Sequence, residues 1–222
     1  HHVGGYLKVA PEHTDARVLE KMKKPGPEDF VAFDKAFRKA SKQSGKDQYL
    51  IPYYIASHPG SDLNAMIDLA LFLKRNGYKP DQVQDFIPSP FDVAACMYHT
   101  GLDPSTRKPV TVAKHLRDRK LQRALLQFFK PENWFEVRKA LIDAGRRDLI
   151  GEGCDALIPA SPPREARERR RRDADARFDG AYVHTVPGGG EKKKRSRKQS
   201  RNEAGAGYRP ARKSAADPRT PR

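Results

Sequence analysis

Polar groups capable of chemistry follow three separate apolar runs of the sequence. Glu12 and His13 follow the first run. Residues 56–60 begin at the last residue of the second run, and residues 85–89 end the third. These segments supply two carboxylates, two imidazoles, hydroxyl groups and a glycine that permits close backbone approach. Such groups can transfer a proton, hold a metal ion or bind a polar ligand. They can act together only if the fold brings the ends of the three runs to one place.

Each chemical interpretation of these residues has an alternative. Glu12 suits a general base or an acceptor for ribose hydroxyls, and it can also be a solvated loop carboxylate. His13 and His58 could form a metal pair, but no third ligand lies at a recognisable spacing, so zinc is the weaker interpretation. A hydrolase that uses Glu12 and Asp85 needs the two carboxylates within about 10 Å of each other. The sequence contains no G-x-S-x-G elbow, phosphate-binding loop or dinucleotide fingerprint.

The two cysteines indicate little chemistry. Cys96 and His99 have C-x-x-H spacing, but the apolar residues between them predict a buried helix or turn. We therefore expect Cys96 to be a packed thiol rather than a metal ligand. Cys154 carries no specific signal. Two cysteines are too few for a disulfide framework or for an all-cysteine metal site held by this chain.

The elements that must position the polar groups alternate between strand and helix. Runs rich in apolar and β-forming residues predict strands at residues 6–10, 49–56 and 82–87. Apolar residues at helical spacing predict three helices: one from Asp15 to Lys24 capped by Thr14, one from Pro27 ended by Gly45, and one capped by Ser61 and ended by Asn76-Gly77. This order is typical of parallel βαβ units, which bind ligands beyond the carboxyl ends of their strands. We therefore expect three strand ends to border one crevice.

The second half of the chain predicts helices followed by a tail. Amphipathic spacing indicates helices at residues 116–129 and 131–144, which form a small all-α region. From Pro159 onward the chain has too little apolar surface to offset the entropy of ordering, so we expect disorder. Only residues 181–186 suggest a brief strand.

The positive charge of the chain is concentrated in this tail. The 222 residues carry a formal net charge of +16, and residues 159–222 hold 19 Lys and Arg against 8 Asp and Glu. An unstructured basic arm gains affinity for nucleic acid by releasing counterions. Contact with RNA or the ribosome through residues 164–213 is therefore an alternative function, although few aromatic residues are interleaved with these charges.

The rest of the composition limits the class of protein. The chain is long enough to bury a core, and no apolar run approaches the ~20 residues that a membrane span needs. The sequence also shows no signal peptide, so we expect a cytoplasmic protein without a membrane partner. His1-His2 could be a purification-tag remnant. A start without Met, immediately before a predicted strand, favours instead a segment of a longer protein.

Several stretches of the sequence resemble one known family. The stretch from His1 to Thr14 is similar to the late-barrel segment of the YgiQ-type radical S-adenosylmethionine proteins, an uncharacterised family. The similarity continues through seven further stretches: residues 18–26, 48–53, 57–60, 81–90, 97–101, 133–134 and 149–151. The resemblance thus covers about residues 1–151.

The resemblance implies a fold and an activity. Residues 1–105 would form the C-terminal part of a partial (β/α) barrel with parallel strands, residues 106–158 a helical region, and residues 159–222 a disordered basic tail. In such enzymes a [4Fe-4S] cluster on a C-x-x-x-C-x-x-C loop cleaves S-adenosylmethionine to a 5′-deoxyadenosyl radical, which abstracts hydrogen from a substrate. That motif is absent here, so this chain alone is not expected to bind a cluster or to be active.

The resemblance also implies which residues face S-adenosylmethionine. The residue that ends the first strand would reach the ribose or the methionine moiety. The segment after the second strand would pack against the adenine, and two residues after the third would make an apolar contact. Six positions correspond to these roles: Glu12, Ser57, His58, Gly60, Phe86 and Pro88. Ser61 follows Gly60 where the family usually has a glutamate.

Overall fold

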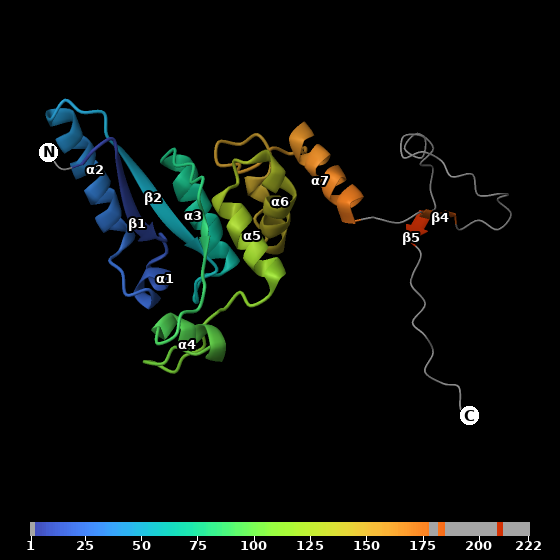
Figure 1. Ribbon diagram of the computed structural model, residues 1–222, viewed down its shortest axis with the longest axis horizontal. Helices are drawn as coiled ribbons and strands as arrows, with labels where there is room; N and C mark the ends of the chain where they lie inside the picture. Colours follow the sequence, from blue (N-terminus) through green and yellow to red (C-terminus); the bar gives the residue numbers. More distant parts are fainter. Residues whose placement is uncertain (1–2, 178–181, 185–207, 211–222) are drawn as a thin grey trace. The chain divides into compact units, whose positions relative to one another are not determined.

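The described part of the chain begins with alternating strands and helices. The computed structural model describes residues 3–177, 182–184 and 208–210 (Figure 1). Its first six elements are β1 (Tyr6–Glu12), α1 (Ala16–Lys21), α2 (Pro27–Gln43), β2 (Tyr49–Ala56), α3 (Leu63–Arg75) and β3 (Gln84–Asp85). The predicted order of three strands separated by helices is therefore confirmed, as is the α/β class of the fold.

The three strands form one parallel sheet in the order β1-β2-β3. Tyr6 of β1 pairs with Tyr49 of β2, and Ile55 near the end of β2 pairs with Gln84 of β3. The prediction of a third strand over residues 82–87 was too long, because β3 pairs only with the last residues of β2. All three strands run in the same direction, so their carboxyl ends meet at one edge of the sheet.

Helices are the main regular elements of the remaining described chain. They are α4 (Val93–Thr100), α5 (Leu116–Leu126), the 3-10 turn η1 (Pro131–Asn133), α6 (Trp134–Asp143), the 3-10 turn η2 (Arg147–Leu149) and α7 (Arg164–Arg177). The two predicted helices over residues 116–129 and 131–144 correspond to α5 and α6. The chain divides into two compact units, His1–Arg169 and Arg170–Arg222. The sheet and helices α1 to α6 all belong to the first unit.

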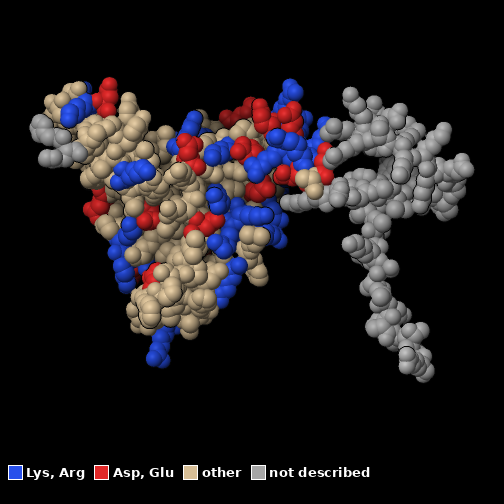
Figure 2. All heavy atoms as spheres, viewed as in Figure 1, with Lys and Arg blue, Asp and Glu red and all other residues tan. Residues whose placement is uncertain are grey.

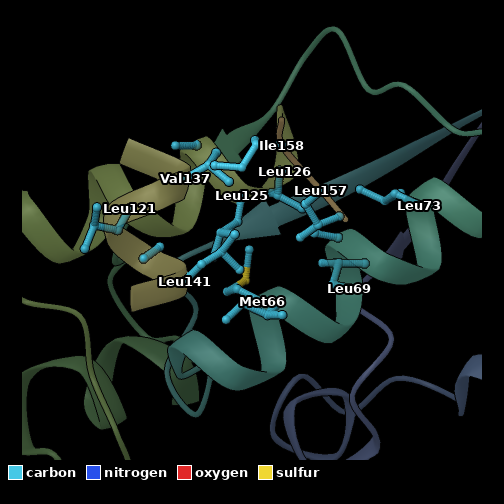
Figure 3. Close-up of a cluster of buried hydrophobic side chains, with 14 of the residues drawn as sticks. Met66, Leu69, Leu73, Leu121, Leu125, Leu126, Val137, Leu141, Leu157 and Ile158 are labelled. Carbon is cyan, nitrogen blue, oxygen red and sulfur yellow. The ribbon is translucent and has the colours of Figure 1, made fainter. Parts of the chain in front are cut away.

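One apolar core joins the sheet to the helices that follow it. Helix α3 buries Met66, Leu69 and Leu73 against Leu125 of α5 and Leu141 of α6 (Figure 3). Spacings of three and four residues place the α3 side chains on one face of the helix. Burial of each such side chain contributes roughly 1.5–3 kcal/mol. The helical region therefore packs in the same core as β2 and α3. This core also contains Tyr54 and Ala56 of β2.

Two predicted helix caps were each wrong by one residue. Helix α1 is capped by Asp15, whose carboxylate accepts a hydrogen bond from the Arg17 N–H at 2.8 Å, and not by Thr14. Helix α3 is capped by Asp62, which accepts from the Ala65 N–H at 2.8 Å, and not by Ser61. In both places a hydroxyl residue precedes a carboxylate, and the carboxylate occupies the cap.

Helix α7 lies in the region that the sequence predicts to be disordered. Its residues are mostly Arg, Glu and Ala, which favour helix, and Arg164 pairs with Glu168 one turn later at 2.8 Å. Ala166 is only 1% exposed and belongs to the main core. Intrinsic helix propensity combined with one anchored residue therefore gives order where the composition predicts none.

The rest of the tail is described at two places only. Strand β4 (Tyr182–His184) pairs antiparallel with β5 (Tyr208–Pro210), which confirms the brief strand predicted at residues 181–186. The predicted RNA contact at residues 164–213 lies largely outside the described residues.

Figure 2 shows Lys and Arg interspersed with Asp and Glu around α7. Within the described residues, no helix is both long enough and apolar enough to cross a membrane.

Candidate active site

A cavity of about 850 Å³ opens at the carboxyl ends of the three strands. Glu12 ends β1, His58 follows β2 by two residues, and Asp85 and Phe86 lie at the end of β3; all four line the cavity. The prediction that three parallel strand ends border one crevice is therefore confirmed. Of the six predicted ligand-binding residues, Glu12, His58 and Phe86 line the cavity, whereas Ser57, Gly60 and Pro88 do not.

Glu12 enters the cavity through an unusual backbone conformation. Its φ angle is +68°, and the pairing of β1 with β2 is irregular between Val9 and Glu12. A residue with a side chain costs about 1 kcal/mol or more in this left-handed region, and such strain concentrates at functional sites. Lys24 Nζ lies 3.5 Å from a carboxylate oxygen of Glu12 and donates to the carbonyl of Ala10 at 2.8 Å.

His58 forms an aromatic wall of the cavity with Phe86. Its Nδ1 lies 2.8 Å from the Pro59 carbonyl, so Nδ1 carries the proton and Nε2 is left as an acceptor. Its ring meets the ring of Phe86 edge-on, with centroids 5.1 Å apart. Burial lowers the pKa of His58, and the bond to Pro59 offsets this only in part. At neutral pH the side chain therefore presents an uncharged ring with one free acceptor nitrogen.

Ser57 and Gly60 shape the loop that carries His58. Ser57 is 1% exposed, has a φ angle of +65°, and its hydroxyl has no hydrogen-bond partner. Gly60 has a φ angle of +94°, and a Cβ there would lie 2.7 Å from Cδ of Lys21. Its N–H donates to the carbonyl of Thr111 at 2.8 Å. Gly60 thus accommodates the Lys21 side chain, and its role in the loop is conformational.

His13 does not form a metal pair with His58. Its Nδ1 accepts the N–H groups of Thr14 and Asp15, both at 3.0 Å, so Nε2 carries the proton and faces the Ser61 hydroxyl at 3.3 Å. Both ring nitrogens are therefore occupied. No cluster of three or more His, Cys, Asp or Glu side chains suited to a metal ion occurs among the described residues.

The prediction that Cys96 is a packed thiol was wrong. Cys96 and His99 are both exposed on α4, whereas Ala94 and Met97 face the core. The short helix buries only one stripe, and Cys96 lies beside this stripe rather than within it. Cys154 is also exposed, and neither cysteine lines the cavity.

Sequence reasoning missed the cationic side chains of the cavity. Lys21, Lys23 and Lys24 line it from the end of α1, and Arg119 and Arg123 line it from α5. The four-residue spacing of the two arginines places them on one helix face, which the sequence does show. Nothing in the sequence indicates that this face meets the lysines across the ends of the strands.

The sequence is similar to a known family model and to several curated proteins. Residues 81–220 match the family model described as a domain of unknown function, DUF3362. The chain belongs to this family. It is 50% identical over 169 residues to a UPF0313 protein of Rhodopseudomonas palustris, covering 73% of this chain and 25% of the relative. It is 46% identical over 182 residues to the UPF0313 protein YgiQ of Escherichia coli, covering 80% of this chain and 25% of that protein.

These relatives confirm the YgiQ-type resemblance of the sequence. A UPF0313 protein of Vibrio cholerae is 46% identical over 199 residues, or 85% of this chain. The DUF3362 chain spans about a quarter of the length of the curated relatives it matches. No solved structure is significantly similar to it.

The strained Ser57 gives a first testable prediction. Ser57→Gly should leave the free energy of unfolding unchanged or raise it by up to about 1 kcal/mol, because glycine relieves the positive φ angle and removes a buried, unpaired hydroxyl. The matched control is Ser41→Gly, in helix α2, which loses a 2.9 Å bond to Gln48 and should cost about 1 kcal/mol or more. Urea denaturation measures both. Equal destabilisation by the two changes would show that Ser57 is not strained.

Proposed function

We propose that this chain is the C-terminal part of a radical S-adenosylmethionine enzyme, and that its cavity binds S-adenosylmethionine beside a substrate of unknown identity. The observation that carries the proposal is the convergence of Glu12, His58 and Phe86, from three parallel strand ends, on one cavity. The three strands would be part of a partial (β/α) barrel. In α/β proteins, ligands bind beyond the carboxyl ends of the strands.

The residues of the cavity fit S-adenosylmethionine. A volume of about 850 Å³ lies within the range of small-molecule sites. The carboxylate of Glu12 can accept hydrogen bonds from ribose hydroxyls or from an ammonium group. The rings of His58 and Phe86 provide an apolar surface against which a purine can pack. When bound together with a reduced cluster, S-adenosylmethionine would supply a radical for hydrogen abstraction.

The residues of this chain do not fit a [4Fe-4S] cluster. Such clusters are held by several cysteine thiolates, and the sequence contains only Cys96 and Cys154. Both are exposed and lie away from the cavity lining. Thiolates from another part of a longer protein would have to hold the cluster.

The cavity residues would act by binding and orientation. Lys24 holds the Glu12 carboxylate in place through its 3.5 Å contact, while the strained backbone directs this side chain toward the ligand. The uncharged ring of His58 offers Nε2 as an acceptor without placing a positive charge next to a sulfonium. Phe86 is 6% exposed and packs on Tyr98, so it excludes water from that side of the cavity.

The experiment uses the full-length protein that contains this chain, reconstituted anaerobically with iron and sulfide. We expect a reductant to cause cleavage of S-adenosylmethionine to 5′-deoxyadenosine. Glu12→Gln should weaken S-adenosylmethionine binding about tenfold or more, because a charge-assisted hydrogen bond contributes about 1.5–3 kcal/mol. Glu20→Gln, on the exposed face of α1, is the matched control and should bind normally. No cleavage by protein with an intact cluster would overturn the proposal.

A further inference from the structure

The cavity lining carries more positive than negative side chains. Five cationic side chains line it, from the end of α1 and from α5, against the three carboxylates of Glu12, Asp85 and Asp92. A concave site with an excess of one charge concentrates the field and attracts ligands of opposite charge. The lining is therefore biased toward an anionic ligand.

All three carboxylates are already engaged by groups of the protein. Glu12 lies 3.5 Å from Lys24, and Asp85 lies 3.0 Å from an Nη of Arg123. Asp92 caps α4 by accepting a hydrogen bond from the N–H of Ala94 at 3.1 Å. The negative charges of the lining are thus matched locally, and the surplus of positive charge resides on other side chains.

Two cations of the lining have no carboxylate partner among residues 3–176, whose side chains the structure describes. Lys23 forms no ion pair there, and Arg119 uses one Nη to donate to the carbonyl of Phe86 at 3.3 Å. A guanidinium carries five N–H donors, so most of those of Arg119 remain available. Lys21, the fifth cation, pairs with Asp103 at 3.6 Å. Arg119 and Lys23 are therefore the groups best able to receive an anion.

The chemistry of Arg119 suits a phosphate-bearing ligand. The N-terminal residues of α4, Val93 and Ala94, also line the cavity, but Asp92 already caps this helix. Arginine binds phosphate with directed hydrogen bonds from its planar group.

We propose that the cavity binds a phosphate ester, with Arg119 and Lys23 holding the phosphate. Such a molecule would be the substrate class of the proposed enzyme, and that assignment rests on the proposed function. Binding of the phosphate itself depends only on the cations of the cavity.

Calorimetric titration of the full-length protein with glycerol phosphate at constant ionic strength tests the proposal. We expect saturable binding that Arg119→Gln weakens about tenfold or more. Arg117→Gln is the matched control, because Arg117 lies on the same helix, pairs with Asp143 and does not line the cavity. Arg119→Lys should retain part of the affinity, and the melting temperature of each variant shows that it is folded.

The arms of the test separate this inference from the proposed function. Equal affinity of the Arg119→Gln and Arg117→Gln proteins for glycerol phosphate would overturn the inference, as would acetate binding as tightly as the ester. S-adenosylmethionine binding is measured in the same variants and should be unchanged by Arg117→Gln, because Arg117 does not line the cavity. Phosphate binding that depends on Arg119, in a protein that does not bind S-adenosylmethionine, would support the anion site and reject the proposed enzyme. Binding of S-adenosylmethionine, without phosphate binding that depends on Arg119, would reject the anion site alone.

Discussion

Lowering the pH from 6.5 to 4 should remove about 3 kcal/mol from the free energy of unfolding through His13 alone. The ring of His13 is 1% exposed, and burial lowers its pKa from 6.5 to about 4. Nearby Asp15 and Asp62 oppose this shift, whereas His58 and Arg17 add to it. Between these pH values the unfolded chain binds a proton that the folded chain does not, so acid favours unfolding.

The pH dependence of the free energy of unfolding can be measured directly. Urea denaturation at several pH values from 7 to 4 should show the free energy of unfolding falling by up to about 1.4 kcal/mol per pH unit through His13. The pKa of Asp15 is lowered from 3.8, mainly by its hydrogen bond to Arg17, so its contribution is lost only at still lower pH. The pKa of His58 is also lowered, which adds to the effect in the same pH range.

His13→Asn is the matched variant for this experiment. An asparagine oxygen can accept the same N–H groups of Thr14 and Asp15 but does not titrate. The variant should therefore lose less stability than the native chain as the pH falls. An identical pH dependence in both proteins would show that His13 is protonated in the folded state without cost.

The sequence predicts the sheet and the position of the cavity because both depend on local patterns. Residues 49–56 form a nearly continuous apolar run, and this run becomes the central strand β2 with its final residue, Ala56, fully buried. The residues after each strand then lie at one edge by the geometry of a parallel sheet. Glu12, His58 and Phe86 were found in this way.

The parts that the sequence does not predict depend on contacts between distant segments. The hydroxyl of Ser61 faces His13, 48 positions away, which leaves the helix cap to Asp62. Pro88 follows β3 in sequence but lies outside the cavity lining, where α5 supplies Arg119 and Arg123 instead. No local pattern shows that α5 reaches the strand ends.

The contact that brings α5 to the strand ends is made by Gln122. Its side chain is 3% exposed, and its oxygen accepts the N–H of Ser57 at 2.9 Å while its nitrogen donates to the carbonyl of Ser61 at 2.9 Å. These two bonds attach both ends of the loop that contains His58 to α5. A backbone group left buried without its partner costs about 1–3 kcal/mol.

Gln122→Met should therefore destabilise the chain by about 2–5 kcal/mol, because methionine keeps the size of the side chain but removes both hydrogen bonds. Chemical denaturation measures this cost. Hydrogen exchange of the Ser57 amide should also become faster, because this amide loses its hydrogen-bond acceptor. Lys120→Met, exposed on the same helix, should change stability by less than about 0.5 kcal/mol. Equal effects of the two substitutions would mean that α5 does not hold the loop, and the position of His58 in the cavity would then need another cause.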